Sequence, residues 1–155
     1  MTAVFPYRPV APIPDTGWIG TMSPADMAKV RRLEQHLLAT QPQIDLQYHH
    51  ELYAGLYDRT VLVPAGHTIT GAPVKIETLL TIVGDCIVGL DGNEVRYTGF
   101  SKIRAAAHRM GVFTAITDTF ISMSFATQAK TREEAEAQFT DEAHRLASRR
   151  QACPV

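Results

Sequence analysis

The chain has 155 residues, of which 45% are hydrophobic and 20% are charged, which is typical of a globular domain and excludes a disordered chain. Fifteen basic residues against sixteen acidic ones give a net charge of −1, which argues against a nucleic-acid-binding protein. No apolar run approaches the roughly 18–20 residues of a membrane span, and the N-terminus lacks the features of a secretory leader. Two cysteines, Cys86 and Cys153, are too few for a disulfide framework. We therefore expect a cytoplasmic protein that binds neither nucleic acid nor membrane.

Residues 1–22 form the first predicted segment, an extended arm rich in proline. Proline fixes φ and favours an extended chain, so we expect neither a helix nor a central strand here. The arm also carries Phe5, Tyr7 and Trp18, which a solvated linker would not need. Two interpretations stay open: the arm covers its own domain, or it docks on another subunit or another protein.

A helix is predicted over residues 23–41. Ser23 is a favourable N-cap, Pro24 suits the first helical position, and Pro42 ends the segment. Apolar side chains recur at steps of three and four residues, as one buried helix face requires: Met27, Val30, Leu33, Leu37 and Leu38.

From residue 44 to residue 127 the sequence predicts short strands separated by turns. Runs rich in β-branched and aliphatic residues occupy 62–63, 68–70, 79–83, 86–88, 94–97, 112–116 and 120–125. The pair Asp91-Gly92 between two such runs is the strongest hairpin signal in the chain. Strands this short and this evenly spaced indicate a β-sandwich or barrel. Cys86 lies in an apolar run and is expected to be an inert core thiol.

A second helix is predicted over residues 131–150. Thr131 and Glu134 have the spacing of a capping box, in which each side chain accepts a hydrogen bond from the other end of the first turn. An apolar stripe follows, formed by Ala135, Phe139, Ala143 and Leu146.

Two stretches of the strand region carry a family resemblance. The first runs from Pro64 through Gly71 to Glu77 and the turn at Gly84-Asp85, and the second runs from Gly99 to about residue 114. With a hairpin between them, they resemble the two motifs of the cupin family. The resemblance implies a double-stranded β-helix, or jelly roll, over residues 44–127. More narrowly, a helix, a jelly roll and a C-terminal helix together resemble short cupin-like proteins encoded by bacteriophages.

The resemblance also implies where a metal would be held, and there the sequence departs from the family. Enzymatic cupins use two histidines and a glutamate from the first motif and one histidine from the second. Here the first histidine positions fall within residues 70–74, which read Thr-Gly-Ala-Pro-Val, and the second falls on Met110. Only Glu77 remains, so no metal or other cofactor is expected. The alternative is a displaced site of His67, Glu77 and His108, in which His108 would share a strand face with Met110.

Other polar clusters have simpler interpretations. His49 and His50 are adjacent, and adjacent strand residues point to opposite faces, so the two rings should not converge on one ion. The basic segment 101–109 is expected to be a solvated loop. Four tyrosines could line a subunit interface or be half-buried strand residues: Tyr48, Tyr53, Tyr57 and Tyr97.

We therefore expect a mainly β protein with a cupin-like jelly roll and a helix at each end. The preferred function is a non-enzymatic structural or interaction protein, a bacteriophage virion or assembly component in the cytoplasm of a bacterial host or in the virion. Residues 1–20 would bind other structural proteins, with Phe5, Tyr7 and Trp18 as partner-binding anchors. Because open sheet edges need covering, a homo-oligomer, either a dimer or a trimer, is expected. The alternatives are a small metal-dependent enzyme with the displaced site, or a metal-free protein that binds a small ligand in the mouth of the barrel.

Overall fold

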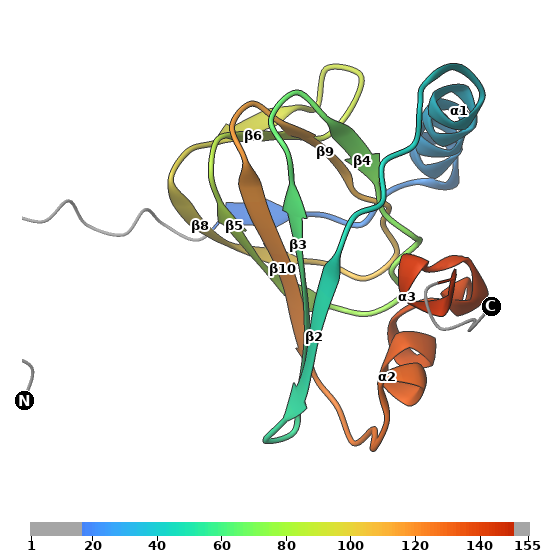
Figure 1. Ribbon diagram of the computed structural model, residues 1–155, viewed down its shortest axis with the longest axis vertical. Coiled ribbons are helices and arrows are strands. Elements are labelled where there is room, and N and C mark those ends of the chain that lie inside the picture. The colour runs from blue at the N-terminus through green and yellow to red at the C-terminus, as the bar shows by residue number, and fades with distance from the viewer. Residues whose placement is uncertain (1–16, 151–155) are drawn as a thin grey trace, which may run out of the picture.

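The computed structural model describes residues 17–150, in which two β-sheets face each other and helices pack beside them (Figure 1). The larger sheet has the strand order β1-β8-β5-β10-β3-β2, and the smaller sheet has the order β4-β9-β6-β7. The helical segments are α1 (Pro24–Thr40), α2 (Arg132–Phe139), the 3-10 turn η1 (Ala143–Arg145) and α3 (Ala147–Arg150). The strands are β1 (Gly17–Ile19), β2 (Tyr48–Tyr53), β3 (Leu56–Val63), β4 (Thr68–Thr70), β5 (Thr78–Val83), β6 (Cys86–Val88), β7 (Val95–Tyr97), β8 (Phe100–Ala105), β9 (Val112–Ala115) and β10 (Thr119–Ala126).

The pairing of the strands makes the fold a jelly roll. β3 pairs with β10, β4 with β9, β5 with β8 and β6 with β7, and all four pairs are antiparallel. Along the sequence each pair encloses the next, from β3 with β10 on the outside to β6 with β7 on the inside, so the eight strands together form one long hairpin. Two further pairs, β10 with β5 and β9 with β6, roll that hairpin into two sheets. Eight strands arranged this way form a jelly roll, and β1 and β2 extend the edges of the larger sheet.

The main core lies between the two sheets. Alternate side chains of β3, β5, β8 and β10 point inward, as the period of a strand requires. Its buried members are Val61, Val63, Leu80, Ile82, Cys86, Val88, Ile103, Ala105, Phe113, Ala115 and Ile121. Cys86 is fully buried, so the prediction of a core thiol is confirmed, and burial raises the pKa of that thiol to about 11.

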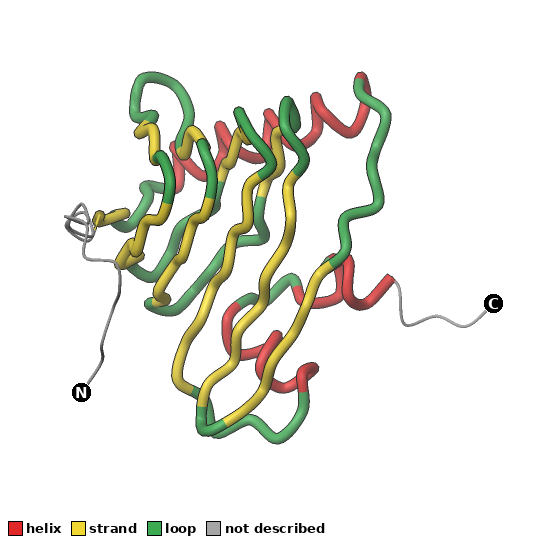
Figure 2. Tube along the Cα trace, turned by 60° about the vertical axis from the view of Figure 1, so that its left-hand side comes forward, coloured by secondary structure: helices red, strands yellow, loops and turns green. Residues whose placement is uncertain are grey.

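Two smaller cores attach the helices to the jelly roll. The C-terminal helices cover the ends of β3 and β10 through a cluster of Tyr57, Val74, Phe125, Ala135, Phe139 and Leu146. α1 packs through Val30 against Met110 and Val112. Figure 2 shows α1 passing one end of the strands, and the C-terminal helices beside the other end of the longest strands. The C-terminal helices are therefore attached to the larger sheet, and α1 is attached beside β9 of the smaller one.

Two local predictions are confirmed. α1 begins with the predicted cap, because the Oγ of Ser23 accepts the N–H of Asp26 at 3.1 Å and Pro24 occupies the first turn. The predicted hairpin joins β6 to β7, and Asp91 and Gly92 in its turn have φ angles of 53° and 86°. Positive φ at both positions is the conformation that an Asp-Gly pair favours.

The prediction that residues 101–109 form a solvated loop is wrong for most of that segment. β8, which extends from Phe100 to Ala105, occupies its first half. β8 pairs with β5 on one side and β1 on the other. Ile103 and Ala105 point into the core, while Lys102 and Arg104 face outward. Two of its three inward positions are Ser and Ala, so the apolar alternation that marks a strand is weak in the sequence.

The prediction of a single C-terminal helix over residues 131–150 is also wrong. The chain instead forms three short helical segments there, α2, η1 and α3. Thr140 takes an extended conformation, and its Oγ1 accepts the N–H of Glu142, a local bond that competes with helix continuation. The carbonyl of Phe139 accepts the N–H of Lys75 at 2.8 Å, so the jelly roll takes up an acceptor at the end of α2.

The predicted arm is described only from residue 17 onward, so Phe5 and Tyr7 lie outside the described residues. Its described part includes β1, an edge strand that runs parallel to β8, in agreement with the expectation that the arm is not a central strand. Ile19 packs on the main core, whereas Trp18 is 63% exposed. The described end of the arm therefore covers its own domain in part and leaves the side chain of Trp18 exposed.

Candidate functional site

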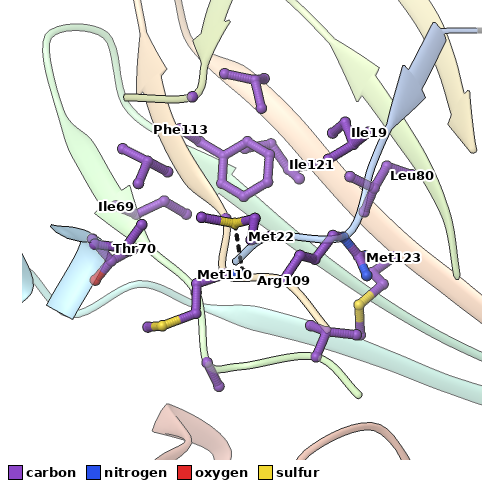
Figure 3. A pocket seen from close by; sticks show the side chains of 18 of the residues that line it. Ile19, Met22, Ile69, Thr70, Leu80, Arg109, Met110, Phe113, Ile121 and Met123 are labelled. Atoms are coloured by element: carbon purple, nitrogen blue, oxygen red, sulfur yellow. Dashed lines mark hydrogen bonds between the residues drawn. The ribbon is translucent and has the colours of Figure 1, made fainter. Parts of the chain in front are cut away.

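A cavity of about 830 Å³ opens between the two sheets, α1 and the C-terminal helices. This volume lies within the range of pockets that hold small organic ligands. Figure 3 shows Phe113, Ile121 and Leu80 gathered around it, with Met110 and Arg109 on the opposite side. The sheets contribute mainly apolar side chains to the wall, among them Ile19, Ile69, Leu80, Val88, Val112, Phe113, Ile121 and Met123.

One wall of the cavity is a single face of α1. Asp26, Val30, Glu34 and Leu38 follow each other at four-residue steps, which places them on the same side of the helix, and all four line the cavity. The helix is held at its base by the packing of Val30. The N–H of Met110 also donates to Met22 Sδ at 3.2 Å, just before the helix begins.

Ion pairs join α1 to the C-terminal segment beside the cavity. The carboxylate of Glu142 accepts hydrogen bonds from Arg31 on α1 and from Arg145, the latter at 2.8 Å. Arg145 in turn donates to Glu34 on α1 at 3.2 Å. The hydrogen bond from Arg31 is the main reason why the pKa of Glu142 lies below its usual range. The acidic groups at this end of the cavity are therefore already paired with cations.

Arg109 brings a buried positive charge to the cavity wall. It is 4% exposed, and its guanidinium donates to the carbonyl of Ala106 at 2.6 Å, to the carbonyl of Ile76 at 3.4 Å and to Thr78 Oγ1 at 2.6 Å. All three acceptors are neutral, and none of the ion pairs formed within residues 17–150 includes Arg109. Burial lowers its pKa to about 10, which leaves the group charged at neutral pH.

Arg59 brings a second guanidinium, and this one has an unused donor. It lies on the inward side of β3, and its Cζ is 4.5 Å from the ring centre of Tyr48 and 5.3 Å from that of Phe139. Its Nη1 is buried without a hydrogen-bond partner. Among the described residues, no ion pair includes Arg59. Stacking on aromatic rings holds the guanidinium in place while its N–H groups stay available.

A histidine and two tyrosines support this end of the site. His50 Nδ1 lies 2.7 Å from the hydroxyl oxygen of Tyr57, and the His50 ring stacks on the rings of both Tyr48 and Tyr57. Burial is the main cause that lowers the pKa of His50, and the nearby charge of Arg59 lowers it further. Tyr57 is fully buried, and burial raises its pKa to about 12, so its hydroxyl keeps its proton.

The residues at the cupin metal positions do not fit a metal centre. Met110 is buried against α1, and Ala72 and Val74 line the same cavity without a ligating atom in their side chains. Glu77 is exposed. Within the part of the chain that the structure describes, no three His, Cys, Asp or Glu side chains lie close enough to share a metal ion.

The three residues of the displaced site are not brought together either. His67 is exposed in a turn, where its Nδ1 lies 3.1 Å from the carbonyl oxygen of Ala65. His108 is exposed at a position with a φ of 60°. The chain therefore turns at His108, and the expectation that it shares a strand face with Met110 is wrong. His49 and His50 do lie on opposite faces of β2, as predicted, and His49 contacts Glu51 at 2.7 Å.

Arg59 and Arg109 are the site residues that sequence reasoning missed. For Arg59 a signal exists. Alternate residues of a strand face the same side, and in the strand over residues 56–63 this places Arg59 on the side of the buried residues Tyr57, Val61 and Val63. A cation at an inward position of a strand is unusual enough to suggest a function. For Arg109 the surrounding basic segment concealed any such signal.

No helix within residues 17–150 combines the length and the apolar content that crossing a bilayer would require.

No protein-family model matches the sequence, and no curated protein matches it. Solved structures with a similar fold include a cupin superfamily protein from Desulfitobacterium hafniense, at 9% identity over 56% of this chain and 82% of that chain, with a TM-score of 0.47. KdgF from a Halomonas species matches at 17% identity over 58% of this chain and 87% of that one, with a TM-score of 0.46.

The cupin domain of Schizosaccharomyces pombe Cnp3 matches at 13% identity over 59% of this chain and 67% of that chain, with a TM-score of 0.45. At these identities a likeness concerns the fold alone. The nested strand pairs of the chain itself carry the structural conclusion. The chain is a mainly β protein with a cupin-like jelly roll, flanked by one N-terminal helix and by short C-terminal helices.

Proposed function

We propose that this chain is a non-enzymatic binding protein whose cavity takes an amphipathic anion, a carboxylic acid with an alkyl or aryl body. The observation that carries the proposal is the buried Nη1 of Arg59, which lacks a hydrogen-bond partner in the wall of an apolar cavity. A buried polar group left unsatisfied costs about 1–3 kcal/mol, and a charge-assisted hydrogen bond to a ligand carboxylate would recover that cost.

The rest of the cavity supports the same class of ligand. Arg109 adds a second positive charge without an opposing carboxylate, while Glu34 and Glu142 are paired with arginines. The sheets supply an apolar surface, and each Å² of ligand surface buried there contributes roughly 25 cal/mol. A neutral polar ligand would accept the hydrogen bond but would leave the positive charge without a counter-charge, and a purely apolar ligand would leave the guanidinium buried against hydrocarbon.

The non-enzymatic part of the proposal rests on the residues at the motif positions. Met110, Ala72 and Val74 present apolar side chains where enzymatic cupins are expected to present metal ligands. The rival function, a metal-dependent enzyme using His67 and His108, makes a different prediction. Elemental analysis of protein purified without chelator would then find stoichiometric Fe, Mn, Ni or Zn, and His108→Ala would lose it.

A structural role in a bacteriophage virion or its assembly is a second proposal, as are the bacterial cytoplasm or the virion as its location. The exposed side chain of Trp18 favours a partner-binding role for the end of the arm that precedes α1. A homo-oligomer, a dimer or a trimer, belongs to the same proposal and can be checked by light scattering.

Calorimetric titration with dodecanoic acid, and with dodecanol as its uncharged counterpart, tests the binding proposal. We expect the acid to bind more tightly than the alcohol. Arg59→Gln should weaken acid binding by about tenfold or more, because the charged hydrogen bond is lost. Arg104→Gln is the matched control, because Arg104 is exposed on the outer side of β8 and should leave binding unchanged. Equal affinity for acid and alcohol, or an unchanged affinity in Arg59→Gln, would overturn the proposal.

A further inference from the structure

A row of exposed apolar side chains crosses the outer face of the larger sheet. It is made of Leu62 on β3, Phe120 on β10, Val83 on β5 and Phe100 on β8, each between 41% and 49% exposed. They are direct register partners: Leu62 pairs with Phe120, Phe120 with Val83, and Val83 with Phe100. The four side chains therefore form one continuous line at right angles to the strands. We call it the outer row.

The outer row is narrow, because polar side chains occupy a parallel row two residues further along the strands. The members of this polar row are again register partners: Thr60, Ser122, Thr81 and Lys102. A hydrogen bond joins the hydroxyls of Thr60 and Ser122, and Lys102 donates another to Thr81. Strands lie about 4.8 Å apart, so a row across four of them is roughly 15 Å long, the length of about five extended residues. A line of this width and length fits an extended peptide better than the flat face of a domain.

The direction of β1 shows where the N-terminal arm leaves the sheet. β1 runs parallel to β8, with Gly17 beside Ile103 and Trp18 beside Arg104. Moving backward from Gly17 therefore leads toward the start of β8, and Phe100 lies only three positions before Ile103. Gly17 therefore lies roughly 10 Å, or three strand residues, from the end of the outer row at Phe100.

We propose that residues 1–16 of this chain cross the outer row and cover it. Sixteen extended residues span up to about 50 Å, which is ample for the roughly 10 Å from Gly17 to the row and the 15 Å along it. Proline at positions 6, 9, 12 and 14 removes backbone donors, so the segment is poorly suited to extend a sheet edge and better suited to lie on a face. Proline-rich segments pack well on aromatic side chains, which Phe100 and Phe120 provide.

The arm of the same chain is favoured over that of a second copy because it is tethered next to the row. A short tether gives an effective concentration on the order of millimolar, above the concentration of free protein. At about 3.1 Å per extended residue, the part of the segment that reaches Phe120 and Leu62 is the part around Val10.

Photo-crosslinking of the full chain tests this assignment. Benzoylphenylalanine in place of Val10 should, on irradiation, form a bond to a peptide that contains Val83, Phe120 or Leu62. In an equal mixture of ¹⁴N- and ¹⁵N-labelled protein, the crosslinked peptides should pair within one isotope only. Mixed-isotope pairs would show that the arm covers a second copy and would overturn the assignment to the same chain. Crosslinks to other surfaces, or none, would overturn the proposal altogether.

Two variants with a shared design provide the control. Phe120→Ser removes an exposed side chain of the outer row and should lower the crosslink yield about fivefold or more, the loss expected for one aromatic contact. Leu56→Ser removes an equally outward side chain at the far end of β3, 51% exposed, and should leave the yield unchanged. Thermal unfolding of both variants verifies that each is folded. An unchanged yield in folded Phe120→Ser contradicts the proposal.

Discussion

At the scale of single residues, the group that links the site to the solution pH is His50. Its ring stacks on Tyr48 and Tyr57, and its Nδ1 lies 2.7 Å from the Tyr57 hydroxyl, which keeps its proton. Burial and the charge of Arg59 both disfavour a protonated ring, so His50 is neutral at pH 7 in the folded chain. The unfolded chain has neither of these constraints.

The free energy of unfolding should therefore fall as the pH drops below about 6.5. In that range the unfolded chain binds a proton at His50 that the folded chain does not, which favours unfolding until the pH reaches the lowered pKa of the folded state. Urea denaturation at pH 7.5, 6.5 and 5.5 measures the effect. His50→Gln should make the decline shallower, whereas His49→Gln, on the exposed face of β2, should not. Identical declines in wild type and His50→Gln would rule out this role.

At the scale of elements, the sequence predicts those that depend on local interactions. α1 and the β6–β7 hairpin follow from Ser23 and from Asp91-Gly92, whose bonds and φ angles involve only near neighbours. β8 was missed because Ile103 is its only large apolar residue at an inward position, and pairing with β5 and β1 stabilises it. The C-terminal helix divides because long-range bonds, such as the one between Lys75 and Phe139, compete with helix continuation.

The C-terminal elements depend on one buried carboxylate, that of Glu136. It is fully buried and accepts hydrogen bonds from Ser148 at 2.5 Å and from Arg149 at 2.6 Å, which ties α3 back to α2. Glu136→Gln keeps the shape and removes the charge, so it should cost about 2–3 kcal/mol of unfolding free energy. Glu133→Gln makes the same chemical change on the exposed side of α2 and should have little effect. Equal stabilities by urea denaturation would contradict this account.

At the scale of the whole molecule, the site could not be predicted because chain segments distant in sequence form it. Arg59 and Arg109 are fifty residues apart, and only the strand order brings both into one cavity. A β-sandwich or barrel was predictable, since most of its strands and turns have local signals, and the resemblance to cupins then implied the jelly roll. The register of each pair follows from the buried face. The alternation in β3 also offered a partial clue, because it places Arg59 on the inward side with Tyr57 and Val61.

The closure of the cavity is also a property of the whole molecule, because α1 and the C-terminal segment meet there through Glu142. This carboxylate bonds to Arg31 on α1 and to Arg145, which in turn bonds to Glu34 on α1. The apolar anchorage of α1 lies elsewhere, in Val30 against Met110 and Val112. Loss of the ion pairs should therefore let the helix move away from the cavity while it stays attached at that anchor.

Glu142→Gln should accordingly speed hydrogen exchange of the α1 amides over residues 24–40 without unfolding the jelly roll, whose amides should exchange as before. The ion pairs are partly exposed, so added salt should raise exchange in wild type toward that of the variant. Asp141→Asn is the control, because Asp141 lies beside Glu142 in the chain but pairs with Lys75 of the jelly roll and does not line the cavity. If dodecanoic acid binds as proposed, its release measured by stopped flow should quicken in Glu142→Gln and not in Asp141→Asn. Unchanged α1 exchange in Glu142→Gln would show that Val30 and its neighbours hold the helix closed without the ion pairs.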